Sequence, residues 1–222
     1  MLRRQMGLAC AAVCAQPMRA LGETRGLKRV PVSGPPLRRA WEEFEALADE
    51  AARFPLRERF AWVNDAINRR VVHADDAEQF GDDVWLTPLE TLAFGRGDCE
   101  DAAIAKFFLL LAAGSPPTAL RLLYARHRPL ATPGVVQAHV VALARLPFVD
   151  PLALDSLNPL AVALSHRSDL EPVLSFDRDR LWLGAQGQDC GCASTRLRPW
   201  RELLARIDAQ PRWRTAQCGD AA

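Results

Sequence analysis

The sequence predicts an α+β fold in which a central helix packs on an antiparallel β-sheet. Three observations favour this fold class: amphipathic helical patterns come first, an almost wholly apolar helical segment follows, and short segments rich in valine and leucine come last. Because the helices precede the strands, and the strands are close enough for hairpins, we expect the two kinds of element to segregate. A length of 222 residues fits one domain.

Two amphipathic helices are expected near the N-terminus, at residues 38–53 and 56–71. The apolar side chains of the first recur at helical spacing, at Trp41, Phe44, Leu47 and Ala51. Five acidic residues then lie between residues 75 and 83. We interpret this segment as a solvated loop, because its spacing is not that of an EF-hand.

A short helix is predicted before the central helix. Thr87 and Pro88 form a typical helix start, so a short helix should end near Gly95. Residues 100–113 are apolar on every helical face apart from Lys106, which predicts a helix buried nearly all round.

Short strands should follow at residues 119–127, 135–146 and 151–157, with a fourth at 181–184. These segments are bounded by prolines or glycines, as sheet strands often are. Together they predict the antiparallel sheet on which the central helix packs.

The nearly balanced overall charge gives no support for a nucleic-acid partner. The chain has 28 basic and 27 acidic residues, so no strong field of either sign is expected. No apolar run approaches the ~20 residues that a membrane-spanning helix needs.

Four parts of the chain are expected from these patterns. Residues 1–22 resemble a weak secretory signal, because Arg3 and Arg4 precede a short alanine-rich segment; a cytoplasmic leader is the alternative, and we favour export. Residues 23–36 are expected to be a linker, residues 37–200 the folded domain, and residues 201–222 an arginine-rich tail.

The cysteines near the C-terminus leave two alternatives open. Cys190 and Cys192 are close in sequence, and in an oxidising compartment either could pair with Cys218. The alternative is three unpaired thiols.

One cysteine lies among carboxylates at the start of the central helix, in the stretch GRGDCEDAAIAKFF. The carboxylates of Asp98, Glu100 and Asp101 disfavour the thiolate, which is the reactive form of Cys99. The helix start favours it, because free N–H groups and the helix dipole lower a thiol's pKa. Asp98 and Asp101 also fit a capping box, so capping explains Asp98 as well as any functional role does.

A nucleophilic cysteine needs a base, and the base needs an orienting group. His139 stands out because it interrupts an apolar strand, where an unpaired imidazole is costly; a satisfied core histidine and a catalytic base explain it equally well. Asp155, at the end of the next strand, could bind one imidazole nitrogen, although a turn-forming role also fits and Asp150 is a rival. The other histidines are expected to be exposed, at positions 73, 127 and 166.

Three stretches carry a resemblance to a known family. They are DDVWLTPLETLAFGRGDCEDAAIAKFFLLLAAG, AHVVALA and PLALDSLNPLAVALSHRSDLEPVLSFDRDRLWLG. In this order they resemble the bacterial transglutaminase-like cysteine proteinases of the LapG type, which are periplasmic adhesin proteases. The W-x-T-P-x-E lead-in and the G-x-G-D-C-E-D turn are its most specific parts. The resemblance implies a papain- and transglutaminase-like fold.

The resemblance also implies roles for individual residues. Cys99 would be the nucleophile, His139 the general base and acid, and Asp155 the group that orients the imidazole. The protein would be a thiol protease, a hydrolase located in the periplasm.

Calcium is the cofactor that the resemblance implies. It would bind beside the nucleophile through Asp98 and Glu100, with Asp101 and Asn64 as weaker candidates. A bound Ca²⁺ would turn carboxylates that oppose the thiolate into ligands of an ion.

The implied substrate is a large secreted biofilm adhesin, cleaved near its N-terminus, so that the protease regulates cell adhesion. The implied partner is an inner-membrane c-di-GMP receptor that sequesters the protease. Two alternatives stay open: an acyltransferase of the transglutaminase kind, and a catalytically idle calcium-dependent binding module.

Overall fold

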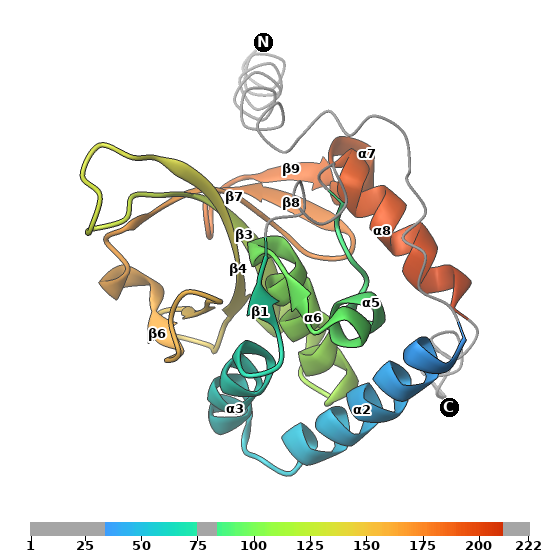
Figure 1. Ribbon diagram of the computed structural model, residues 1–222. Helices are drawn as coiled ribbons and strands as arrows, with labels where there is room; N and C mark the ends of the chain where they lie inside the picture. The colour runs from blue at the N-terminus through green and yellow to red at the C-terminus, as the bar shows by residue number, and fades with distance from the viewer. Residues whose placement is uncertain (1–33, 75–83, 211–222) are drawn as a thin grey trace.

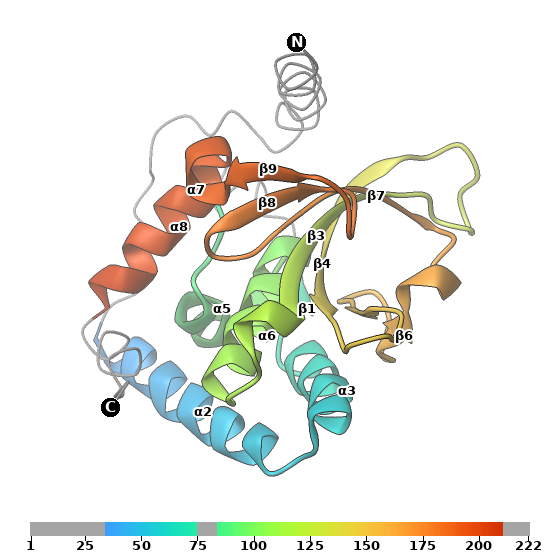
Figure 2. The same cartoon turned by 180° about the vertical axis from the view of Figure 1, so that it is seen from behind.

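The computed structural model describes residues 34–74 and 84–210 (Figures 1 and 2). Its α-helices are α2 (Pro35–Ala52), α3 (Leu56–Asn68), α5 (Pro88–Phe94), α6 (Cys99–Ala112), α7 (Ala193–Arg196) and α8 (Arg198–Ala209). Its strands are β1 (Val72–His73), β2 (Arg96–Gly97), β3 (Leu120–His127), β4 (Gln137–Ala144), β5 (Leu152–Leu154), β6 (Val162–Ala163), β7 (Leu170–Phe176), β8 (Arg180–Leu183) and β9 (Asp189–Cys192). Single 3₁₀ turns lie at Pro117–Ala119 and Leu164–His166.

The main sheet has seven strands in the order β6-β5-β4-β3-β7-β8-β9, and all neighbours run antiparallel. β3 and β4 pair along their whole length, from Leu120 opposite Ala144 to His127 opposite Gln137. The predicted α+β class is therefore confirmed, and the four predicted strands correspond to β3, β4, β5 and β8.

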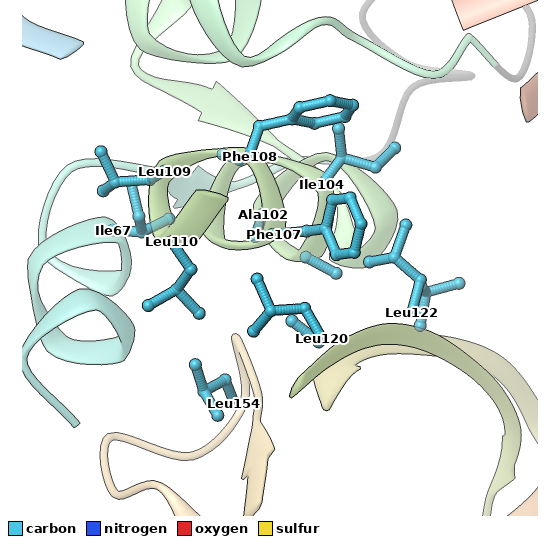
Figure 3. Packing of buried hydrophobic residues seen from close by; sticks show 14 of the residues in the cluster. Ile67, Ala102, Ile104, Phe107, Phe108, Leu109, Leu110, Leu120, Leu122 and Leu154 are labelled. Atoms are coloured by element: carbon cyan, nitrogen blue, oxygen red, sulfur yellow. The ribbon is translucent and has the colours of Figure 1, made fainter. Parts of the chain in front are cut away.

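The central helix α6 lies between the sheet and a layer formed by α2, α3 and α5 (Figures 1 and 2). Its apolar side chains reach both layers, and Ile104, Phe108, Leu109 and Leu110 are completely buried. Figure 3 shows Leu110 pointing toward Leu154 of β5, with Ile67 of α3 close by. Each such side chain contributes about 1.5–3 kcal/mol by leaving water, so α6 is held firmly in place.

The C-terminal region corrects the expected domain boundary at residue 200. Helix α8 continues to Ala209, and its buried residues Trp200, Leu203, Leu204 and Ile207 share one face. The Trp200 ring contacts Phe107, Phe108 and Phe176, at centroid distances of 6.2, 6.0 and 5.2 Å. The arginines that suggested a tail alternate with this apolar stripe, so residues 201–209 belong to the folded domain.

Five of the described strands were not predicted, β1, β2, β6, β7 and β9, and the two longest of them show why. β7 contains Glu171 and Pro172, which interrupt its apolar pattern, and it pairs with β3 across an irregularity at Tyr124 and Ala125. β9 is short and contains Gly191 at a φ of 96°. Neither segment has the alternation on which strand prediction depends.

The expected signal peptide, most of the linker, the acidic segment 75–83 and Cys218 lie outside the described residues. Cys190 is disulfide-bonded, whereas Cys192 has a free thiol. Within the described part of the chain, no helix combines the length and hydropathy needed to cross a membrane.

Candidate active site

The nucleophile candidate Cys99 is the first residue of α6. Asp98 caps the helix: its Oδ1 accepts a hydrogen bond from the Asp101 N–H at 3.4 Å, and Asp101 Oδ2 accepts one from the Asp98 N–H at 3.3 Å. This capping box confirms the predicted helix start. It also fixes the thiol at the N-terminal end of the helix dipole.

Asp101 ties the helix start to the segment that precedes α5. Its Oδ1 accepts a hydrogen bond from the Leu86 N–H at 2.7 Å, and its side chain is fully buried. Gly97 makes room for it, because a Cβ at that position would lie 2.5 Å from Asp101 Oδ2. Since both oxygens accept main-chain N–H groups, Asp101 serves to position the turn, and we do not assign it to a metal.

The thiol of Cys99 donates a hydrogen bond to Glu100 Oε2 at 3.0 Å. Burial raises its pKa well above the usual value, and the negative charges of Glu100 and Asp98 raise it further; a hydrogen bond from the Val140 N–H acts in the opposite direction. In this state the thiol is therefore protonated at neutral pH. The contact with Val140 places the sulfur next to the main chain of His139.

His139 and Asp155 form a direct pair. His139 Nε2 lies 2.7 Å from Asp155 Oδ1, and the two side chains are 4% and 0% exposed. Asp155 Oδ1 also accepts a hydrogen bond from the Leu157 N–H at 2.9 Å. Burial opposes ionisation of Asp155, but the hydrogen bond and charge of His139 outweigh it and hold the carboxyl pKa well below its usual range. Nε2 therefore carries the proton that Asp155 accepts, which leaves Nδ1 to face a nucleophile.

A second group of charges, not predicted from the sequence, adjoins this pair. Arg167 forms ion pairs with Asp155 Oδ2 and with Asp169 Oδ2, each at 2.7 Å. His127 Nε2 lies 3.3 Å from Asp169 Oδ2, and the His127 and His139 rings have centroids 5.2 Å apart. The expectation that His127 is exposed is wrong, since it is 9% exposed. Its position in an otherwise buried strand was the available signal.

Helix α3 holds the loop that follows Asp155. Asn64 Nδ2 donates hydrogen bonds to the carbonyls of Asn158 and Pro159, each at 3.1 Å. Asn68 Nδ2 donates to the carbonyls of Asp155 and Asn158, at 2.8 and 3.1 Å. Asn64 thus holds the loop that follows Asp155.

The chemistry around Cys99 fits a calcium ion in part. The carboxylates of Asp98 and Glu100 flank the thiol in sequence, and carboxylate oxygens are the ligands that Ca²⁺ prefers. Across residues 34–74 and 84–210, no three His, Cys, Asp or Glu side chains gather in a way that could hold a metal. Main-chain carbonyls and water would have to supply the other ligands.

Comparisons with known proteins agree with this geometry. Residues 48–158 match the family described as bacterial transglutaminase-like cysteine proteinase. A comparison with curated proteins gave no match.

Among solved structures, the EGTA-treated form of Legionella pneumophila LapG is similar, with 31% identity, a TM-score of 0.66, and coverage of 87% of this chain and 97% of that one. The calcium-bound form has 34% identity and a TM-score of 0.65, and covers 79% of this chain and 93% of that one. Family match and structural likeness together show that the chain is a cysteine peptidase and belongs to the bacterial transglutaminase-like cysteine proteinases.

Proposed function

We propose that this protein is a calcium-dependent cysteine endopeptidase in which Cys99, His139 and Asp155 form the catalytic triad. One observation carries the proposal. His139 and Asp155 form a buried pair at 2.7 Å, and the residue that follows His139, Val140, contacts the Cys99 thiol at the start of α6 through its N–H. These contacts support the assignment of Cys99, His139 and Asp155 as nucleophile, base and orienting acid.

In the proposed reaction, His139 Nδ1 takes the proton of Cys99 as the sulfur attacks the peptide carbonyl carbon. The imidazolium then gives that proton to the departing amine, which leaves an acyl group on the sulfur. Water attacks this thioester, His139 removes the water's proton, and the thiolate leaves with the acid released. Asp155 keeps its hydrogen bond to Nε2–H throughout and stabilises the charged ring.

The negative oxygen of each tetrahedral intermediate needs hydrogen-bond donors. The first N–H groups of a helix have no intrahelical partner, and the N–H of Cys99 is one of them. We assign it to the oxyanion, where a fixed donor is worth about 10²–10³ in rate.

Glu100 explains why the reaction would depend on an ion. Burial raises the thiol pKa most, and the Glu100 carboxylate, which accepts the thiol proton, raises it further, so the sulfur needs a compensating positive charge to be a good nucleophile. Calcium, when bound to Asp98 and Glu100, supplies the positive charge that favours the thiolate. In the proposed reaction the thiol proton leaves Glu100 and passes to His139.

We infer a substrate and location from the likeness to LapG. The substrate would be a large secreted adhesin of biofilms, cut near its N-terminus in the periplasm, and an inner-membrane c-di-GMP receptor would sequester the protease. Hydrolysis is favoured over transfer to an amine because the matched family is one of proteinases.

The test uses the purified chain and a peptide spanning a small-residue linker of such an adhesin, with calcium or with EGTA. We expect cleavage in calcium, at least ~10²-fold less in EGTA, and none above background for Cys99→Ala. Glu45→Gln, at an exposed position on α2, is the matched control for Glu100→Gln, which should weaken the calcium requirement.

Product masses separate the alternatives. Hydrolysis adds one water across the cut bond, whereas a transferase gives an amine adduct. Cleavage that persists in Cys99→Ala contradicts the mechanism, and a Cys99 that alkylates like an ordinary thiol in both calcium and EGTA favours the idle binding module.

A further inference from the structure

Lys106 is a buried cation that the proposed reaction does not use. It lies two turns after Cys99 on α6, and its side chain is 0% exposed. Its Nζ has no hydrogen-bond partner within the described residues. A buried ammonium without partners is costly, so its place in a helix that is otherwise apolar needs a reason.

Several unpaired acceptors come from the elements around it. Buried oxygens without a hydrogen-bond donor in the described structure are Asn64 Oδ1, Asn68 Oδ1 and Ser156 Oγ, and Asp155 Oδ2 has Arg167 as its partner. All four residues belong to, or bind, the loop that follows β5. One ammonium with three N–H donors and three oxygens in need of donors are complementary groups.

Asp155 is the group that links Lys106 to the site. Burial lowers the pKa of Lys106 to about 7, and the charge of Asp155 is what counteracts this. Asp155 Oδ1 is occupied by His139 and Leu157. Oδ2 is ion-paired with Arg167 at 2.7 Å, and because a carboxylate oxygen has two lone pairs it can accept a bond from another donor as well.

The helix geometry supports the connection. Cys99 and Lys106 are seven residues apart, so they share one face of α6 and are separated by about 10 Å along its axis. The thiol stands at one end of this face and the ammonium at the other. Asp155 and His139 would span the distance between them.

We propose that Lys106 is a positioning residue for the triad: through ordered water shared with Asn64 and Asn68, its ammonium holds the Asp155 carboxylate, and thereby the His139 ring. This proposal rests on the proposed function for its effect on catalysis. Its effect on His139 is independent of any substrate. A site of this polarity and burial commonly holds water with two to four partners.

The first measurement is the pKa of His139, determined by NMR. It is made in a Cys99→Ala background, because the measurement does not require an active enzyme. The titratable and charged groups around this ring are His127, Asp155, Arg167 and Asp169, and all four are kept in the variant. Lys106→Met removes one positive charge, so the pKa of His139 should rise by about half a unit. Leu110→Met, a volume-conserving change on the same helix, should leave it unchanged.

The second measurement is catalysis and stability in the Cys99 protein. We expect Lys106→Met to lower kcat about 10- to 100-fold at nearly constant KM, because a small misplacement of reacting groups has such an effect. The ratio of wild-type to variant kcat should be larger at pH 6 than at pH 8, since the ammonium loses its proton near pH 7. The melting temperature of Lys106→Met should be no lower than that of the wild type, because an apolar side chain replaces a buried charge.

These outcomes decide the proposal. An unchanged His139 pKa overturns it, even if the chain cleaves peptides. A raised pKa without any cleavage would leave the positioning role intact and contradict only the proposed function. If Lys106→Met does not fold, Lys106→Gln keeps the polarity without the charge, and the same His139 shift is expected.

Discussion

Two histidine–aspartate pairs lie side by side on the sheet, and they differ in burial and in distance. His139 and Asp155 are 2.7 Å apart with side chains 4% and 0% exposed, whereas His127 and Asp169 are 3.3 Å apart with side chains 11% and 16% exposed. Arg167 contacts the carboxylates of both pairs. Residue types alone would therefore nominate either pair for catalysis.

The two pairs differ in their position relative to the start of α6. The residue after His139 contacts the thiol through its N–H, while His127 lies on the neighbouring strand, opposite Gln137. Burial lowers the pKa of His127, and the adjacent His139 lowers it further, so His127 stays neutral near pH 7. The comparison indicates that nearness to the thiol, and not residue type, distinguishes the proposed catalytic pair from the second pair.

Replacing the two histidines gives the largest expected difference. His139→Ala should lower kcat/KM at least ~10³-fold, because it removes the general base. His127→Ala, its matched control, should lower it less than ~10-fold. Initial rates of peptide cleavage check this, and equal losses in the two variants would show that both rings act in the reaction.

Replacing the two carboxylates gives a smaller difference. Asp155→Asn should lower kcat about 10²- to 10⁴-fold, because the charge that fixes the imidazole tautomer and stabilises the imidazolium is lost. Asp169→Asn changes the second pair and reaches Asp155 only through Arg167, so it should change kcat by a few-fold. The check is kcat measured across pH at saturating substrate; an Asp155→Asn protein with wild-type kcat contradicts the assigned role.

Arg167 serves both pairs, and its replacement should act mainly on stability. The pKa of Asp155 is held well below its unfolded value near ~3.9, so its ionised form stabilises the fold above that pH and the contribution is lost as acid protonates it. Arg167→Gln should reduce the free energy of unfolding by about 1–3 kcal/mol at pH 7.

Urea unfolding at pH 7 and at pH 3 measures this loss. The difference from wild type should be full at pH 7 and smaller at pH 3, because Asp155 then begins to gain a proton in the variant. A loss that grows as the pH falls would contradict the ion pair. Arg126→Gln, on an exposed ion pair with Glu171, is the control and should change stability by less than ~1 kcal/mol.

Much of the fold followed from local patterns in the sequence. The apolar run after Cys99 predicted α6, and the capping residues Thr87 and Asp98 predicted where α5 and α6 begin. Such features could be recognised because they act over a few residues. His139 and Asp155 could be nominated because a polar residue in an apolar strand demands a partner. The structure brings these two together, while their catalytic roles stay predictions.

The charges around the site could not be predicted in the same way. Arg167 and Asp169 lie beyond β6, and only strand pairing brings them to His127. The role of α8 was hidden because arginines separate its apolar residues. Lys106 was visible as an exception in the pattern, but its neighbours on α3 and after β5 depend on tertiary packing.

The last helix of the domain has a consequence for when activity can arise. Arg206 on α8 binds the Trp85 carbonyl and Glu90, at the segment that leads into the Cys99 turn, and Trp200 packs under the same segment. During synthesis these residues leave the ribosome after every other part of the site. Until α8 has been synthesised and packed, a growing chain therefore lacks these contacts with the segment that leads into the Cys99 turn.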